Sequence, residues 1–201
     1  MSNDIKDTVT NCQICADFQA CNSRQPLQTH KIPDHPWSRV AADLFSLHSK
    51  NYIVLVDYHS NFLEVSELLD TSASSVIQFL REQFSRHSIP DCLVTDNDSQ
   101  IVSQEFIQFA TNWEFKHVTS SPCYPKSDGK AQSVVKVAKS VSKKALKDGR
   151  DPWLAFLDYR NTPTEGMNSS PAQRLMSRRT LTLLPTATSL LHPGVVQGVD
   201  E

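Results

Sequence analysis

The hydrophobic pattern of this chain changes its period near Thr71, and this change constrains the fold more than any other feature. Ahead of it, three short runs rich in β-branched and aromatic residues are separated by turn residues such as His59-Ser60-Asn61. These runs occupy residues 40–47, 52–58 and 62–69. Short runs of this kind, joined by tight turns, are typical of an antiparallel three-strand meander.

The apolar residues that follow recur at helical spacing, and Ser72 is placed to cap the helix that they form. They share one helical face and are Val76, Ile77, Leu80 and Phe84. Residues 92–95 and 115–118 are short strands, each followed by a helical segment, and Pro152 suits the first turn of a last helix. This element order predicts an α/β protein with a ribonuclease H-like fold, a five-stranded mixed sheet flanked by helices.

Two acidic residues are brought together by that predicted topology. Asp43 lies within the first strand and Asp96 directly follows the fourth. Strands that are joined through helices pair in parallel with right-handed crossovers, so the end of the fourth strand lies beside the middle of the first. We therefore expect the two carboxylates to lie within about 8 Å of each other, close enough to share a metal ion.

Several separate motifs, in order and at matching spacing, resemble the integrases of retroviruses and Ty3/gypsy-type retrotransposons. They are Ile32-Pro-Asp-His-Pro-Trp-Ser-Arg-Val-Ala-Ala-Asp-Leu-Phe45, Ile53-Val-Leu-Val-Asp-Tyr58, Ser120-Ser-Pro-Cys-Tyr-Pro-Lys-Ser-Asp-Gly-Lys-Ala131, Tyr159-Arg-Asn-Thr-Pro163 and Ser170-Pro-Ala-Gln173. From about residue 183 to the end no motif of the family is found. The resemblance implies an integrase core that carries out DNA integration by metal-dependent phosphoryl transfer.

The resemblance also implies which residues form the site. Members of this family use two aspartates and a glutamate, and here the corresponding positions hold Asp43, Asp96 and Gln132, with thirty-five residues between the last two. Asp43 would bridge two Mg²⁺ or Mn²⁺ ions, Asp96 would bind one of them, and Gln132 would face the other. The two ions stabilise the attacking and leaving oxygens of an in-line displacement.

Gln132 departs from the family pattern and predicts impaired catalysis. An amide keeps the shape of a glutamate but loses its charge, so metal binding is expected to be weak. The lost contact is plausibly worth ~3–5 kcal/mol of transition-state stabilisation. Asp98 and Ser133 also depart from the family, where glycine and arginine are usual. Asp128 is the one nearby acid that could replace the glutamate.

A row of lysines on the helix after Gln132 indicates a DNA-binding face. Lys136, Lys139 and Lys143 lie at +4, +7 and +11 from Gln132, on the helical face directed at the predicted site. The formal net charge is only −2, so any basic surface must be local. The alternative is an ordinary solvated helix face. Tyr124, in the loop before the helix, is either a stacking partner for a base or a packing aromatic.

Three functional hypotheses follow from these features. The first is an integrase-like DNA-binding core of retrotransposon origin, impaired in catalysis. The second is a non-catalytic module, domesticated or degenerate, that binds nucleic acid or protein. The third, a ribonuclease H acting on RNA–DNA hybrids, fits the motif order less well. DNA is the expected partner, and a homodimer remains open.

The domain organisation predicted from the sequence has three parts. Residues 1–35 contain Cys12-x-x-Cys15, which has zinc-ligand spacing but lacks the upstream histidines of the family, so we expect a truncated zinc module without zinc and a linker. Residues 36–182 form the core and 183–201 a tail. No run reaches the ~18 apolar residues of a membrane span, and an intracellular protein, nuclear or cytoplasmic, is expected.

Three further residues carry predictions about packing and hydrogen bonding. Asp57 in the second strand is either an accessory acid or a strand-end group with satisfied hydrogen bonds, and the second interpretation is favoured. Trp113 and Trp153 lie on apolar helix faces and are predicted to belong to the core.

Overall fold

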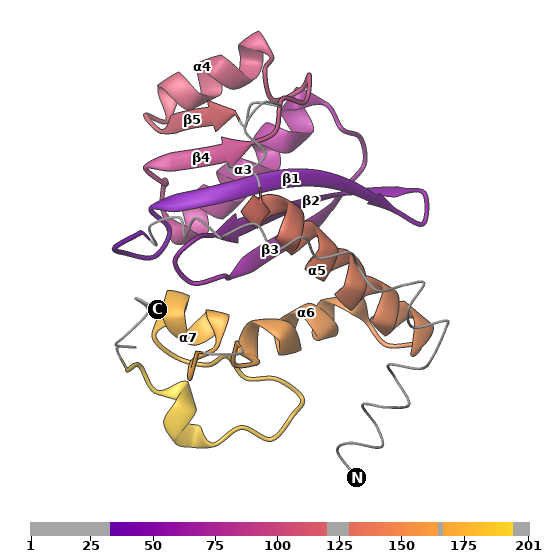
Figure 1. The fold of residues 1–201 in the computed structure, drawn as a ribbon, viewed down its shortest axis with the longest axis vertical. Helices are drawn as coiled ribbons and strands as arrows, with labels where there is room; N and C mark the ends of the chain where they lie inside the picture. Colours follow the sequence, from indigo (N-terminus) through magenta and orange to yellow (C-terminus); the bar gives the residue numbers. More distant parts are fainter. Residues whose placement is uncertain (1–32, 120–128, 165–166, 195–201) are drawn as a thin grey trace, which may run out of the picture. The chain divides into compact units, whose positions relative to one another are not determined.

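Five strands form one mixed sheet in the computed structural model, as the sequence predicts (Figure 1). They are β1 (Arg39–Leu47), β2 (Lys50–Asp57), β3 (Leu63–Leu68), β4 (Cys92–Thr95) and β5 (Lys116–Thr119). The strand order is β3-β2-β1-β4-β5. β1, β2 and β3 pair antiparallel as a meander, whereas β4 pairs parallel to β1 and β5 parallel to β4.

The structure describes residues 33–119, 129–164 and 167–194, with the side chains of 129–132 excepted. The chain divides into two compact units, 1–31 and 32–201, and every described residue belongs to the second. Cys12, Cys15, Tyr124 and Asp128 lie outside the described residues, so the expectations that rest on them stay predictions.

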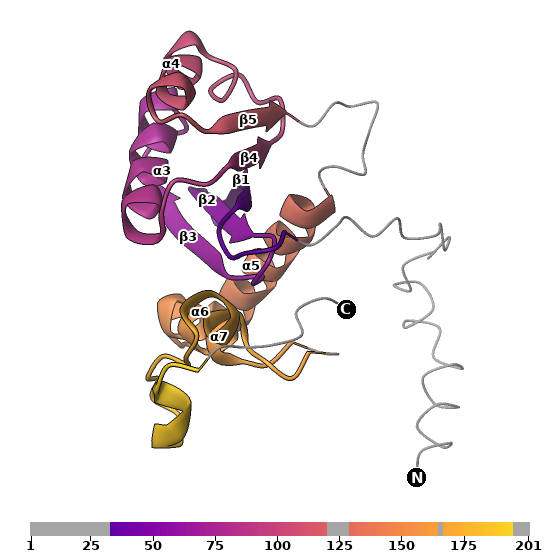
Figure 2. The ribbon, with the colours of Figure 1, turned by 90° about the vertical axis from the view of Figure 1, so that its left-hand side faces the viewer.

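Helices cover both faces of the sheet. α3 (Ala73–His87) and α4 (Gln104–Asn112) lie on one face, and α5 (Gly129–Lys147) and α6 (Pro152–Asn161) lie on the side opposite them (Figure 2). The short α7 (Pro171–Met176) and the 3-10 helix η1 (Thr188–Leu191) follow. Alternate strand residues face opposite sides of a sheet. The core accordingly has two clusters, one that includes Leu80 and Phe84 of α3 and one that includes Val134 and Ala138 of α5.

Side-chain caps explain where several helices begin. Ser72 accepts a hydrogen bond from the Ser75 amide at the start of α3, and Ser103 accepts one from Phe106 at the start of α4. Asp151 caps α6, with Pro152 in its first turn. Such caps satisfy amides that have no partner inside the helix, which makes these boundaries readable from the sequence.

Trp153 corrects one prediction about the core. Trp113 packs partly buried against the α3 and α4 cluster, as predicted, but Trp153 of α6 is 50% exposed. The prediction was wrong because Trp153, in the first turn of α6, packs against the buried Phe156 but has half of its own surface uncovered. None of the helices in the described part of the chain is both long and apolar enough to cross a membrane.

Candidate metal and nucleic-acid site

The parallel pairing of β1 with β4 relates Asp43 to Asp96. The register pairs Arg39 with Cys92 and Ala41 with Val94. Asp43 follows Ala41 by two residues and Asp96 follows Val94 by two residues, so the two acids stand in the same relation as these strand partners. The ladder ends at Ala41 and Val94, and its continuation, at a strand spacing of about 4.8 Å, would bring the backbones of Asp43 and Asp96 side by side. The expected parallel pairing of the two strands is confirmed, while the approach of the two acids to within about 8 Å stays a prediction.

Strand alternation shows which face of the sheet the acids occupy. Ala41 and Phe45, which flank Asp43 at a spacing of two, both belong to the core cluster that includes Val134 and Ala138 of α5. Asp43 therefore shares the α5 face. Val94 of β4 is in that cluster too, and Asp96 follows it two residues later, directly after the end of the strand. Both aspartates are half-buried.

The backbone at Asp96 is held by a hydrogen-bonded group that the sequence did not reveal. The Thr95 hydroxyl lies 2.9 Å from the Asp96 carbonyl oxygen and 2.9 Å from Nε2 of His117 on β5. The His117 ring packs against Phe106, with centroids 4.9 Å apart. Burial lowers the pKa of His117, which favours the neutral imidazole at neutral pH. In the sequence, the only sign of this hydrogen-bonded group was a polar residue, His117, within a four-residue strand.

Asp98 does not strain the chain after β4. No positive φ is found at this residue, although glycine is usual there in the family. Its carbonyl accepts hydrogen bonds from the amides of Ile101 and Val102, and its own amide donates to an Asp96 carboxylate oxygen over 3.3 Å. The turn thus accommodates aspartate without the backbone freedom of glycine.

The third predicted position, Gln132, lies in the first turns of α5, and its side chain is outside the described part of the structure. Among the described residues no group of three His, Cys, Asp or Glu side chains is placed to hold a metal ion. The described donors at the site are therefore the carboxylates of Asp43 and Asp96.

The three predicted lysines lie along α5, with Lys136 and Lys143 exposed and Lys139 partly buried. The Lys139 ammonium lies 5.6 Å from the centre of the Phe45 ring. Because Phe45 is two residues beyond Asp43 on the same strand face, Lys139 lies on the face that carries the acids. None of these lysines forms an ion pair with another residue that the structure describes.

Asp57 is a structural acid rather than an accessory one. It is fully buried and accepts hydrogen bonds from the amides of Trp37 (3.0 Å) and Ser60 (2.9 Å) and from the Ser60 hydroxyl (2.5 Å). These bonds close the turn between β2 and β3. The interpretation of Asp57 as a satisfied strand-end group is confirmed.

The two motifs near the end of the core attach its last helices to the sheet. Arg160, in the first motif, donates from Nε to the Leu63 carbonyl oxygen (2.8 Å) and from Nη2 to the Glu64 carboxylate (2.6 Å), which joins α6 to β3. Glu64 also contacts Nε2 of His87 at the end of α3 (3.1 Å). Helices from both faces of the sheet thus meet at one carboxylate.

A second arginine holds α7. The Arg174 guanidinium is buried and donates to the Ser60 carbonyl oxygen (2.9 Å), the Ser169 carbonyl oxygen (2.5 Å) and the Thr164 hydroxyl (2.8 Å). The Ser170-Pro-Ala-Gln173 motif forms a capping box, in which Ser170 and Gln173 satisfy each other's amides. These motifs position helices, a role that sequence reasoning did not assign to them.

Glu64→Gln is expected to lower the free energy of unfolding by about 1–3 kcal/mol at neutral pH. Burial raises the pKa of the Glu64 carboxyl, but the His87 hydrogen bond and the Arg160 charge outweigh it, so the pKa is lowered overall. The stabilisation is therefore complete above the unfolded-state pKa of about 4.3 and is lost as pH falls through the folded-state value.

Urea unfolding of both chains across the acidic range measures this effect. The difference between them should shrink steadily in acid. Glu67→Gln is the matched control, because Glu67 pairs with Lys50 at the surface (2.9 Å) and should contribute less than about 1 kcal/mol. A Glu64 difference that did not change with pH would rule out the ionised carboxylate as its source.

Comparison with known proteins agrees with this geometry. Residues 33–125 match the family model described as integrase core domain. An uncharacterized protein of Caenorhabditis elegans is 31% identical over 207 residues, which cover 98% of this chain and 16% of that protein. The gypsy retrotransposon integrase-like protein 1 of Rattus norvegicus is 22% identical over 212 residues, covering 100% of this chain and 40% of that protein. The chain thus spans less than half the length of these relatives.

Two solved structures share the fold. A chain of the simian T-cell lymphotropic virus intasome, solved in complex with PP2A regulatory subunit B56 gamma, superposes with a TM-score of 0.68 at 20% identity, covering 94% of this chain and 71% of that one. The catalytic core domain of BIV integrase gives a TM-score of 0.61 at 15% identity, covering 70% of this chain and 94% of that one.

The fold is therefore the ribonuclease H-like fold of integrase catalytic cores. Residues 33–125 thus match the integrase core domain, and the chain as a whole is similar to integrases of retroviruses and gypsy-type retrotransposons.

Proposed function

We propose that this domain is a DNA-binding integrase core whose phosphoryl-transfer chemistry is impaired at Gln132. The observation that carries the proposal is the β1–β4 register, because its continuation would bring Asp96 beside Asp43, which lies on the α5 face of the sheet. Lys139 lies on this same face, against Phe45. Paired carboxylates next to exposed lysines suit a reaction at a phosphodiester, where metal and phosphate must meet.

The described donors fit a hard divalent cation. Mg²⁺ is commonly held by one or two carboxylates, with water and substrate phosphate oxygens completing its octahedron. Asp43 and Asp96 would hold such an ion, or Mn²⁺, and it would supply charge stabilisation to the transition state. The two strands fix the spacing of the carboxylates, and the hydrogen bonds around Thr95 hold the Asp96 backbone in place.

Gln132 is the reason to expect weak turnover. Three carboxylates would offer a charge of −3 to a metal pair of +4, whereas two offer −2. The position facing the second ion should lose most occupancy, because a neutral amide oxygen is a poorer Mg²⁺ ligand than a carboxylate. Asp128 would have to reach the site for full activity to survive.

The second candidate function is a non-catalytic module that keeps the fold for binding. It is favoured by Gln132, an amide at the position where the family has a glutamate. Both functions share the lysine row, so DNA binding does not distinguish them, whereas turnover does. We also propose that the core spans residues 36–182 and that the Cys12 and Cys15 pair holds no structural zinc.

Replacing Lys136, Lys139 and Lys143 together with glutamate is expected to weaken DNA binding and make it less sensitive to salt. Each lost phosphate contact should reduce the slope of log affinity against log salt by about 0.9 on duplex DNA. Fluorescence anisotropy with a short labelled duplex, titrated at several salt concentrations, measures both quantities.

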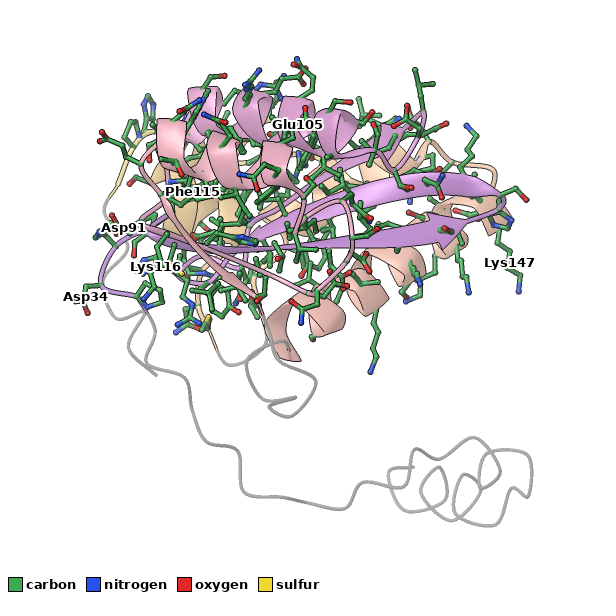
Figure 3. All side chains as sticks on the ribbon, turned by 90° about the horizontal axis from the view of Figure 1, so that it is seen from above. Asp34, Asp91, Glu105, Phe115, Lys116 and Lys147 are labelled. Atoms are coloured by element: carbon green, nitrogen blue, oxygen red, sulfur yellow. The ribbon has the colours of Figure 1, made fainter. Side chains whose placement is uncertain are left out.

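The matched control changes Arg81, Lys116 and Arg178 to glutamate, which alters the net charge equally at exposed sites away from α5. Lys116 lies at the opposite end of the sheet from Lys147 and the β1–β2 hairpin (Figure 3). This control should change the slope little. If the α5 variant kept its affinity and slope, the lysines would be a solvated helix face.

A further inference from the structure

A cavity of about 550 Å³ lies where the β1–β2 hairpin meets the junction of α5 and α6. Its walls include three aromatic residues, Tyr52 of β2 and Trp153 and Phe156 of α6. Leu146 of α5 adds an aliphatic wall. None of these four residues belongs to the paired-acid site, and the integrase core proposal does not use them.

Trp153 gives this cavity an accessible aromatic surface. It is half-exposed and packs against Phe156, with ring centroids 6.1 Å apart and planes inclined by 45°. Phe156 is itself buried, so the Trp153 ring packs against a residue that is fixed in the core. A large aromatic ring that stays open to solvent on a rigid support is suited to stacking against a flat ligand.

Packed side chains link the cavity wall to the lysine row. The Phe45 ring, which lies under the Lys139 ammonium, stacks on Tyr52 with centroids 5.2 Å apart and planes inclined by 15°. Tyr52 in turn lines the cavity. On α5, the exposed Lys143 lies between two cavity-lining residues, Ser142 and Leu146. Side-chain contacts thus connect Lys139, through the buried Phe45 ring, to Tyr52 in the cavity wall.

The charges at the rim do not oppose a phosphate. Glu67 is the one acid that lines the cavity, and Lys50, on the paired strand, neutralises it at 2.9 Å. The hydrogen bond to Glu67 raises the pKa of Lys50, so the lysine keeps its charge at neutral pH. On α5, the exposed Lys143 directly follows the cavity-lining Ser142 and adds a positive charge near the cavity.

We propose that this cavity binds an unpaired nucleobase of a DNA strand whose phosphates follow the α5 lysines. Proteins that bind single strands combine a basic track with aromatic side chains on which bases stack, and that combination is present here. Stacking tolerates any base, so little sequence preference is expected. The inference rests on the proposed DNA binding and adds a preference for DNA with a single-stranded extension.

Anisotropy with three labelled ligands tests the proposal on the full chain. They are a blunt duplex, the same duplex with a short single-stranded tail, and that tailed duplex with abasic sugars in the tail. The tail should tighten binding about 5- to 100-fold over the blunt duplex, the range that stacking of one base supplies. The abasic tail should lose most of this gain, because it keeps the phosphates but offers nothing to stack.

Substitutions at Trp153 identify the cavity as the source of the gain. Trp153→Ala should abolish it and leave the affinity for the blunt duplex unchanged, whereas Trp153→Phe should retain most of it. Leu154→Ala is the matched control, because Leu154 neighbours Trp153 on α6 and is 36% exposed but does not line the cavity. The tailed duplex should also quench tryptophan fluorescence in the parent and not in Trp153→Phe.

The outcomes separate this site from the proposed function. Blunt-duplex binding that depends on the α5 lysines, without a base-dependent gain from the tail, would overturn the nucleobase site and leave DNA binding intact. The cavity would then be assigned to an apolar side chain of a protein partner. Failure to bind any of the three ligands would overturn the proposed function and this inference together. A tail gain that survives Trp153→Ala would overturn the inference alone.

Discussion

The variant Gln132→Glu is expected to join DNA ends about 10²–10⁴-fold faster than the parent chain in the presence of Mn²⁺. The change restores a carboxylate at the position that faces the second ion, and it returns the charge offered to the metal pair from −2 to −3. The gain should appear in the rate of the chemical step, because the interaction strengthens as charge accumulates on the reacting oxygens. A strand-transfer assay with both chains on the same DNA substrate measures it.

Calorimetry on the same two chains checks the cause. Without DNA, the parent should bind divalent metal weakly and at one site at most, through Asp43 and Asp96. The variant should bind more tightly, and adding Asp43→Asn to it should remove both the metal binding and the activity. Two tight sites in the parent, or equal rates in parent and variant, would show that another acid such as Asp128 has replaced the glutamate.

Arg174→Met should lower the free energy of unfolding by about 3–5 kcal/mol, the largest stability change that we expect for a polar side chain of this domain. Methionine fills a similar volume but donates no hydrogen bond. The Ser60 and Ser169 carbonyl oxygens and the Thr164 hydroxyl would each lose a partner in a buried position. Urea unfolding followed by circular dichroism gives the difference.

Arg178→Met is the control for that experiment, because Arg178 lies four residues further on and is exposed. It should change stability by no more than about 0.5 kcal/mol. Domains of this kind are stable by only about 5–15 kcal/mol, so thermal melting in a stabilising osmolyte provides a second measurement if the variant is marginal. An Arg174→Met chain as stable as the parent would show that α7 is held by its apolar contacts.

The parts of the fold that depend on local pattern were predictable. Ser72 and Pro152 mark helix starts through bonds and backbone angles within a few residues, and strand periodicity shows in consecutive residues. Topological rules then placed Asp43 beside Asp96, although fifty-two residues separate them in the sequence.

The residues that sequence reasoning missed are those whose partners are distant and ordinary. Arg160 meets Glu64 across 96 residues, and Arg174 meets Ser60 across 114. Nothing near either arginine in the sequence identifies its acceptor. Trp153 failed for another reason, because helical spacing shows which residues share a face and does not show whether another element covers that face.

Because β1 lies in the centre of the sheet, the position of Asp43 depends on the stability of the fold and not on whether Asp43 takes part in catalysis. β1 is hydrogen bonded to β2 on one side and to β4 on the other, so its backbone cannot shift without breaking two ladders. Asp43 is thereby kept in position by folding stability alone, whether or not it takes part in turnover. Gln132 belongs to α5, a helix that takes no part in those ladders. In such an architecture chemistry is lost long before shape, and shared shape is a weak guide to whether any one copy still reacts.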